Sequence, residues 1–111
     1  TMKQFKKEVH SENLEKLVTQ IVNLVNPKEV ILFGSNARGE AKPHSDLDLM
    51  VIMPEGIHRR YTAQKIYRFI KGVTQPFDII VATPSDLKKY KDDIGFIYHT
   101  ALKQGISVYS E

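Results

Sequence analysis

The sequence lacks several features that would point to particular classes of protein. It contains no cysteine among its 111 residues, so disulfide bonds and thiolate metal sites are excluded. Its apolar runs, such as Leu49–Met53 and Ile79–Ala82, are far shorter than the roughly 20 residues that cross a bilayer. The lysines near the amino terminus are not followed by the apolar core of a signal peptide. We therefore expect a cytoplasmic protein with no membrane partner.

A large excess of charge is also missing. Sixteen Lys and Arg stand against thirteen Asp and Glu, which gives a formal net charge of +3. This mild positive charge suits a phosphate-bearing ligand but falls short of the dense basic stripe of a duplex-binding protein, so nucleic acid is not expected as the primary partner. With 41% hydrophobic residues, the chain 1–111 has the size of one compact domain. We expect no separate domain for recognising an acceptor substrate.

Two helices are predicted in the first two thirds of the chain. Apolar residues recur at helical spacing between Ser11, a suitable N-cap, and Pro27. A second apolar periodicity predicts a helix over His58–Val73, ending near Gly72. Residues 85–103 are predicted to be helical in one or two pieces.

Strands are predicted between and after these helices. Continuous apolar runs bounded by turn residues are typical of buried strands, and a short run near the carboxyl end is expected to form an edge strand. The four segments are Val30–Phe33, Asp46–Ile52, Phe77–Ala82 and Ile106–Tyr109. The alternation of helices and strands favours an α/β domain that contains parallel βαβ units.

Two aspartates separated by one leucine are the most informative feature. In an extended strand, Asp46 and Asp48 would point to one face while the neighbouring leucines point to the core. Such close like charges repel unless solvent or a cation neutralises them, and Mg²⁺ prefers carboxylate oxygen. If the third strand lies beside this one, Asp78 completes a cluster of three carboxylates that could hold two Mg²⁺ ions. On the simpler interpretation, Asp46 and Asp48 are solvated carboxylates on an exposed strand face.

A glycine–serine turn follows the first predicted strand. Gly34 would let the backbone approach an anion, and Ser35 offers a hydroxyl and an amide to phosphate. Arg38 and Lys42 in the following loop could add positive charge near a bound triphosphate. The alternative is an ordinary strand-ending turn with surface basic residues.

The stretch Gly34–Glu40, followed by Ser45–Leu49, resembles the signature of the polymerase-β-like nucleotidyltransferase superfamily. The short chain is most similar to its minimal nucleotidyltransferase (MNT) branch, and the resemblance extends over about Glu29–Ala82. It implies the α/β core of that superfamily. This core is a small mixed β-sheet with helices packed on one face and the acidic cluster at the edge of the other.

The resemblance also implies a role for each matching residue. Gly34 and Ser35 would bind the triphosphate of a nucleotide, expected to be ATP, with Arg38 and Lys42 nearby. Asp46 and Asp48 would ligate two Mg²⁺ ions, and Asp78 would bind the catalytic one. The three aspartates would then be the catalytic residues of a nucleotidyltransferase.

The acceptor implied by the resemblance is a protein. Members of the MNT branch are commonly paired with a HEPN-domain ribonuclease toxin, to which the MNT antitoxin transfers AMP. A binding module that neutralises its partner without catalysis is an alternative, as is a stand-alone transferase acting on a small molecule or RNA. An aromatic and basic groove would favour RNA, and the candidate material is the helix His58–Val73 with Tyr61 and Tyr67. We expect those two rings to lie in the core or at its rim and the basic face to be solvated.

Overall fold

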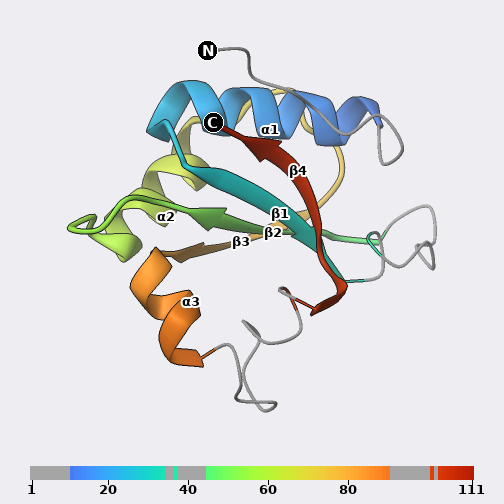
Figure 1. Ribbon diagram of the computed structural model, residues 1–111. Helices are drawn as coiled ribbons and strands as arrows, with labels where there is room; N and C mark the ends of the chain where they lie inside the picture. Colours follow the sequence, from blue (N-terminus) through green and yellow to red (C-terminus); the bar gives the residue numbers. More distant parts are fainter. Residues whose placement is uncertain (1–10, 35–36, 38–44, 91–100, 102) are drawn as a thin grey trace.

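The computed structural model describes residues 11–34, 37, 45–90, 101 and 103–111. Its helices and strands follow one another as α1, β1, β2, α2, β3, α3 and β4 (Figure 1). Their bounds are α1 Glu12–Val25, β1 Glu29–Phe33, β2 Leu47–Ile52, α2 Arg59–Phe69, β3 Phe77–Ala82, α3 Pro84–Tyr90 and β4 Ile106–Ser110. The predicted α/β architecture is therefore confirmed.

The first helix has the predicted limits. The hydroxyl of Ser11 accepts a hydrogen bond from the backbone N–H of Leu14 at 3.2 Å, which satisfies one of the free donors of the first turn. The helix ends at Asn26, which has a left-handed conformation with φ of 50° and whose N–H donates to the carbonyl of Val22. Its buried side chains lie on one stripe: Leu14, Leu17, Val18, Ile21 and Val22.

The four strands form one mixed sheet in the order β3-β2-β1-β4. Strand β1 pairs antiparallel with both β2 and β4, whereas β2 and β3 are parallel and are joined through α2. The predicted βαβ unit is thus β2-α2-β3. The third predicted strand lies beside the second, as expected, and β4 forms an edge of the sheet.

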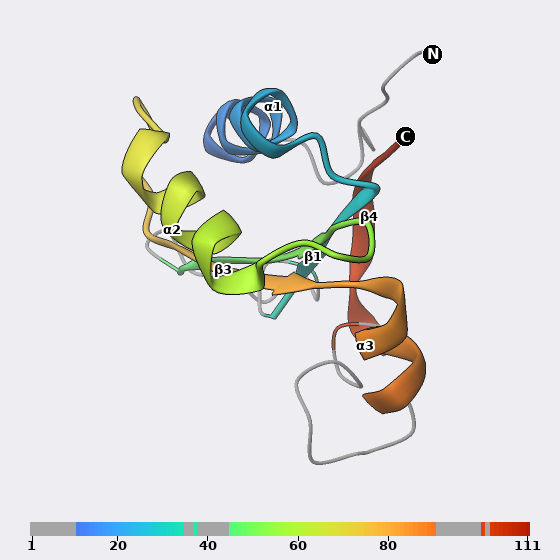
Figure 2. The same cartoon turned by 90° about the vertical axis from the view of Figure 1, so that its left-hand side faces the viewer.

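Each face of the sheet packs against different elements. On one face, α1 and α2 cover a core to which β2 contributes Leu47, Leu49 and Val51 (Figure 2). On the other face, Met50 and Ile52 pack with Ile31, Phe33, Ala82 and Ala101, and Leu87 of α3 packs against this second cluster. Figure 2 shows α3 on the side of the sheet opposite to α1 and α2. By strand alternation, Asp48 lies on the α3 side.

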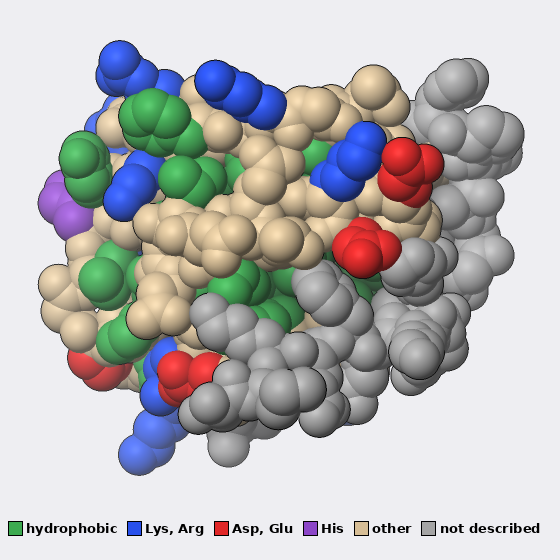
Figure 3. Space-filling model, turned by 90° about the horizontal axis from the view of Figure 1, so that it is seen from above, with side chains coloured by type: hydrophobic (Ala, Val, Ile, Leu, Met, Phe, Trp, Pro, Cys, Tyr) green, Lys and Arg blue, Asp and Glu red, His purple; other side chains and the backbone are tan. Residues whose placement is uncertain are grey.

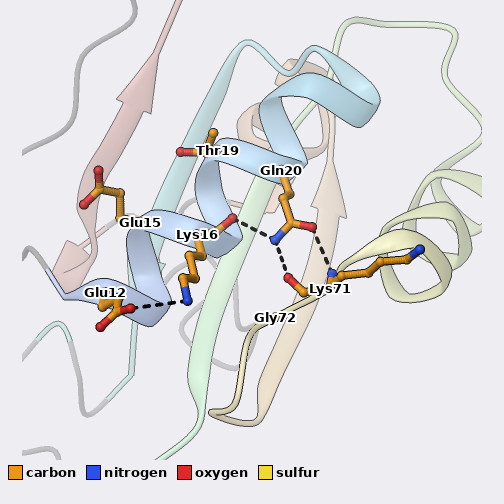
Figure 4. Close-up of a pocket in the computed structure, with 7 residues that line it drawn as sticks. All are labelled: Glu12, Glu15, Lys16, Thr19, Gln20, Lys71 and Gly72. Atoms are coloured by element: carbon orange, nitrogen blue, oxygen red, sulfur yellow. Dashed lines mark hydrogen bonds and ion pairs between the residues drawn. The ribbon is translucent and has the colours of Figure 1, made fainter.

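The second helix is shorter than predicted. The helix was expected to continue to Val73, but α2 ends at Phe69, and Ile70 is already extended. The side chain of Gln20 on α1 explains this end, because its amide accepts from the N–H of Lys71 at 2.9 Å and donates to the carbonyl of Lys71 at 2.7 Å (Figure 4). The backbone of Lys71 is therefore paired with α1 and is not available for another helical turn.

The third helix begins with a capping box. The N–H and hydroxyl of Thr83 each donate to Asp86 at 3.0 Å, and the Thr83 hydroxyl accepts from the N–H of Asp86 at 3.4 Å. Pro84 occupies the first helical position, where its missing N–H is harmless. The rest of the predicted helical region, residues 91–100 and 102, lies outside the described residues.

Among the helices of the described ranges, none is both long and apolar enough to cross a bilayer.

Candidate active site

The two aspartates at the start of β2 lie as the sequence predicts. Asp46 is exposed one residue before the strand, and Asp48 is half-buried within it. Leu47 and Leu49 between and after them are buried in the core under α1 and α2, with exposed fractions of 2% and 0%. Alternation therefore directs the carboxylate of Asp48 away from that core, to the opposite face of the sheet.

Strand β3 brings the third aspartate beside them. Asp48 and Asp78 are direct register partners in the parallel pair β2–β3. Neighbouring strands lie about 4.8 Å apart, and register partners in a parallel pair project to the same face. Asp78 is exposed on an edge strand, so its carboxylate faces solvent beside Asp48.

The turn glycine that ends β1 lies against Asp48. Phe33 is the register partner of Asp48, and Gly34 follows it with φ of +77°, a conformation that favours glycine. A Cβ added at Gly34 would collide with the carboxylate of Asp48 and would lie 3.2 Å from its Cγ. Only glycine therefore allows the turn and this aspartate to approach each other so closely, and the turn adjoins the acidic end of the sheet.

Two hydrogen bonds hold the acidic segment next to the start of β3. The N–H of Leu47 donates to the carbonyl of Pro76 at 2.9 Å, and the side-chain amide of Gln75 donates to the carbonyl of Ser45 at 2.6 Å. Both bonds flank Asp46, so they fix the backbone on either side of it. Gln75 could not be predicted from the sequence, because nothing in its local context indicates a partner 30 residues away.

The side chains do not form a closed metal site. Within the described ranges, no group of three or more His, Cys, Asp or Glu side chains is arranged so that it could hold a metal ion. The donor chemistry nevertheless suits Mg²⁺, because the backbone places three carboxylates at one corner of the sheet. Mg²⁺ prefers such oxygen donors, whereas thiolate and imidazole donors suit other metals. The other predicted ligand-binding residues, Ser35, Arg38 and Lys42, lie outside the described residues, whereas Gly34 is described.

A groove elsewhere on the molecule contains none of the predicted site residues. Its volume is about 520 Å³, and Glu12, Lys16, Gln20 and Lys71 are among its lining residues (Figure 4). It lies along α1, on the face of the sheet opposite to Asp48. Several of its polar groups are paired within the protein: Lys16 with Glu12 at 3.3 Å, and Gln20 with the backbone of Lys71. The groove is the seam between α1 and the end of α2, and we assign it no chemistry.

Comparison with known proteins shows the family of this chain. Residues 12–106 match the nucleotidyltransferase domain family. The chain belongs to that family. The matched residues include Gly34, Asp46, Asp48 and Asp78, and the match supports a nucleotidyl-transfer role for the chain. No curated protein sequence matches the chain.

Solved structures share the fold at low sequence identity. A predicted nucleotidyltransferase from Sulfolobus solfataricus superposes with a TM-score of 0.58 at 22% identity, over 86% of this chain and 76% of that one. A toxin–antitoxin crystal structure with AMP-PNP superposes with a TM-score of 0.53 at 20% identity, over 87% of this chain and 73% of that one. The family match and these neighbours confirm the polymerase-β-like nucleotidyltransferase fold.

Proposed function

We propose that this protein is a Mg²⁺-dependent nucleotidyltransferase that moves AMP from ATP onto a hydroxyl group of a partner protein. The observation that carries the proposal is the meeting of Gly34, Asp48 and Asp78 at one corner of the sheet, within a chain of the nucleotidyltransferase domain family. A turn glycine against paired carboxylates is the arrangement that a metal–triphosphate site needs.

The residues divide the chemistry between them. Asp46, Asp48 and Asp78 would hold two Mg²⁺ ions, which supply charge neutralisation for the triphosphate and acidify the acceptor hydroxyl. The acceptor oxygen forms a bond to the α-phosphorus while the bond to pyrophosphate breaks. Asp78, exposed on the edge strand, receives the hydroxyl proton. The Gly34–Ser35 turn binds the terminal phosphates, with Arg38 and Lys42 adding positive charge.

The three aspartate side chains must turn toward one another to hold metal, since among the described residues no such group is arranged as a metal site. Exposed or half-buried carboxylates can do so by rotating about their χ angles, because the solvent around them leaves room. Mg²⁺ would make that rotation favourable by replacing the repulsion between like charges with attraction. The fixed backbone register between β2 and β3 means that no strand has to move.

For the partner, we propose a toxin of the HEPN ribonuclease type, which this protein would silence by modification as an antitoxin. The sequence resemblance described above leads to this partner. The structural neighbour described as a toxin–antitoxin with AMP-PNP is consistent with it, because a chain of this fold occurs there together with an adenine nucleotide analogue.

The test is transfer of label from α-³²P-labelled nucleoside triphosphates in Mg²⁺, with and without the protein encoded by the adjacent gene. We expect label from ATP on that protein, its loss with Asp48→Asn, and its retention with Glu12→Gln, a control at an exposed position on α1. If none of the nucleotides gives label on the partner, although the two proteins form a stable complex, the catalytic proposal is contradicted and a binding module is favoured.

A further inference from the structure

Helix α2 presents an aromatic surface to solvent. Among the described residues, the large hydrophobic side chains that are exposed are Tyr61, Tyr67 and Phe69, with exposed fractions of 66%, 47% and 47%. All three lie within nine positions of this one helix. Only Thr62 and Ile66 of α2 are buried. The helix therefore packs on the protein through a narrow stripe and leaves its larger apolar side chains outside.

The same helix is basic. It contains no Asp or Glu, and it carries Arg59, Arg60, Lys65 and Arg68, with Lys71 two residues past its end. Arg59 pairs with Asp86 of α3 at 2.7 Å, whereas Arg60, Arg68 and Lys71 are exposed. Figure 3 shows hydrophobic and basic side chains next to each other at the upper left of this face, with acidic side chains at its right and at its lower left. Exposed rings among unbalanced positive charges are unusual for a helix that meets only water.

Two of the three rings, those of Tyr67 and Phe69, contact other groups of the protein. Tyr67 stacks on Phe77 of β3 with ring centroids 5.6 Å apart and an interplanar angle of 8°. Its hydroxyl accepts a hydrogen bond from the N–H of Ile79 at 2.7 Å. The guanidinium of Arg68 lies 5.6 Å from the ring centre of Phe69. Ordered aromatic and arginine side chains bind partners at a small entropic loss, which is why they dominate the energetics of protein interfaces.

The contacts of Tyr67 also connect this surface to the candidate active site. Its two partners, Phe77 and Ile79, flank Asp78 on β3. Strand β3 is an edge strand, so a molecule that rests on α2 and extends over this edge comes directly to Asp78.

We propose that Arg60, Tyr61, Lys65, Tyr67, Arg68 and Phe69, the α2 surface, form the docking site for an acidic surface of a partner protein. The partner supplies carboxylates to the basic residues and an apolar depression to Tyr61 and Phe69. Its acceptor hydroxyl reaches Asp78 across the edge of β3, and this last step rests on the proposed function.

A protein fits the α2 surface better than single-stranded nucleic acid does. Bases bind by stacking on free ring faces, but one face of Tyr67 is used by Phe77 and one face of Phe69 by Arg68. The net charge of +3 is also small for tracking a phosphate backbone. Clustered Tyr, Phe and Arg side chains are instead typical of the centre of protein interfaces.

The test measures docking separately from transfer. Binding to the protein encoded by the adjacent gene is measured by titration calorimetry without nucleotide, using full-length chains. The variants are Arg68→Glu and the double substitution Tyr61→Ser with Phe69→Ser, all at exposed positions. Lys88→Glu, an exposed position on α3 across the sheet, changes the net charge as Arg68→Glu does and is the matched control. Circular dichroism verifies that each variant is folded.

We expect both α2 variants to weaken binding by at least about tenfold, and Lys88→Glu to leave it unchanged. Wild-type affinity in both α2 variants would overturn the docking proposal, as would the absence of any complex with the wild-type chain. If the variants instead lose affinity for a 20-nucleotide single-stranded RNA while the protein complex persists, the surface binds nucleic acid and the proposal is wrong. If docking depends on α2 but the wild-type chain transfers no label, the proposed function fails and the docking site stands.

Discussion

Carboxylates occur at both ends of the parallel pair β2–β3, and their surroundings differ. Beyond the carboxyl ends of the strands, Glu55 accepts hydrogen bonds from the hydroxyl of Ser85, and Asp86 binds both Thr83 and the guanidinium of Arg59. At the starting end, Asp78 has no hydrogen-bond or ion-pair partner for its carboxylate among the residues that the structure describes. At the first end, both carboxylates are therefore paired with groups of the protein, whereas at the second end Asp78 can offer its carboxylate oxygens to a ligand.

The pKa values of Glu55 and Asp86, beyond the carboxyl ends of the strands, follow from the hydrogen bonds that these carboxylates accept. The Ser85 hydroxyl, with further help from Thr83, lowers the pKa of Glu55. Partial burial raises the pKa of Asp86, but hydrogen bonds from Thr83 and Arg59 outweigh this and lower it overall. Both groups are thereby held ionised by groups of the protein itself. A carboxylate with such partners stabilises the fold and needs no cation.

The largest effect is expected at the starting end. Asp48→Asn removes the charge at the centre of the cluster, between Gly34 and Asp78. Changes that act only on outer partners of a metal site reduce activity by about 10- to 100-fold, so this variant should lose more than about 100-fold. The rate of labelled AMP transfer is the measurement, and an unchanged melting temperature is its control. Activity near that of the wild type would remove Asp48 from the site.

Gly34→Ala should have the next largest effect. The turn requires a positive φ, which costs a residue with a Cβ about 1–2 kcal/mol, and the added Cβ also collides with the carboxylate of Asp48. We expect a lower melting temperature together with about a 10- to 100-fold loss of transfer, because Asp48 has to move. Gly56→Ala, which has the same strain with nothing within 4 Å of its Cβ, is the matched control. If the two variants have equal activity, the contact with Asp48 has no role in transfer.

Asp86→Ala should separate stability from activity. It removes the capping box of α3 and the ion pair with Arg59, so unfolding should be easier by about 0.5–2 kcal/mol. Transfer by the folded protein should be unchanged, since Asp86 lies at the other end of the strands. Chemical denaturation and the transfer assay together check this, and a large loss of transfer in the folded variant would contradict the division between the two ends.

The smallest effect concerns acid stability. Because the pKa values of Glu55 and Asp86 are lowered in the folded state, their contribution is complete above the unfolded values, near pH 4, and is lost as the pH falls through the folded values. The double variant Glu55→Gln with Asp86→Asn should therefore show a shallower decline in stability below about pH 4 than the wild type. Urea unfolding at several pH values measures this, and parallel curves would contradict it.

The sequence predicts most of the fold because its local signals agree with the packing. Ser11 and Pro27 bound α1, and the apolar runs become strands within one residue of their predicted limits. The end of α2 could not be predicted, since it depends on Gln20, 51 residues away in the sequence. Tyr61 was predicted to lie in the core or at its rim, and the structure shows that it is not in the core. Helical spacing alone does not reveal which side of α2 meets the sheet.

Part of the candidate site could also be predicted from local signals in the sequence. Alternation alone gives the common face of Asp46 and Asp48, and the apolar run around Asp78 gives its strand. The register that pairs Asp48 with Asp78 and brings Gly34 against Asp48 depends on long-range strand pairing, which no local pattern encodes. The assignment of Ser35, Arg38 and Lys42 to the nucleotide remains a prediction from the sequence.

The most direct test of the account is to find which end of the β2–β3 pair binds a divalent cation. Titrating Mn²⁺ with a non-hydrolysable ATP analogue into ¹⁵N-labelled protein broadens the NMR signals of amides near the bound ion. We expect broadening at Gly34, Leu47, Asp48 and Asp78, with the amides of Glu55 and Asp86 unaffected. Broadening confined to Glu55 and Asp86, or none at the start of β2 and β3 at saturating Mn²⁺, would contradict it.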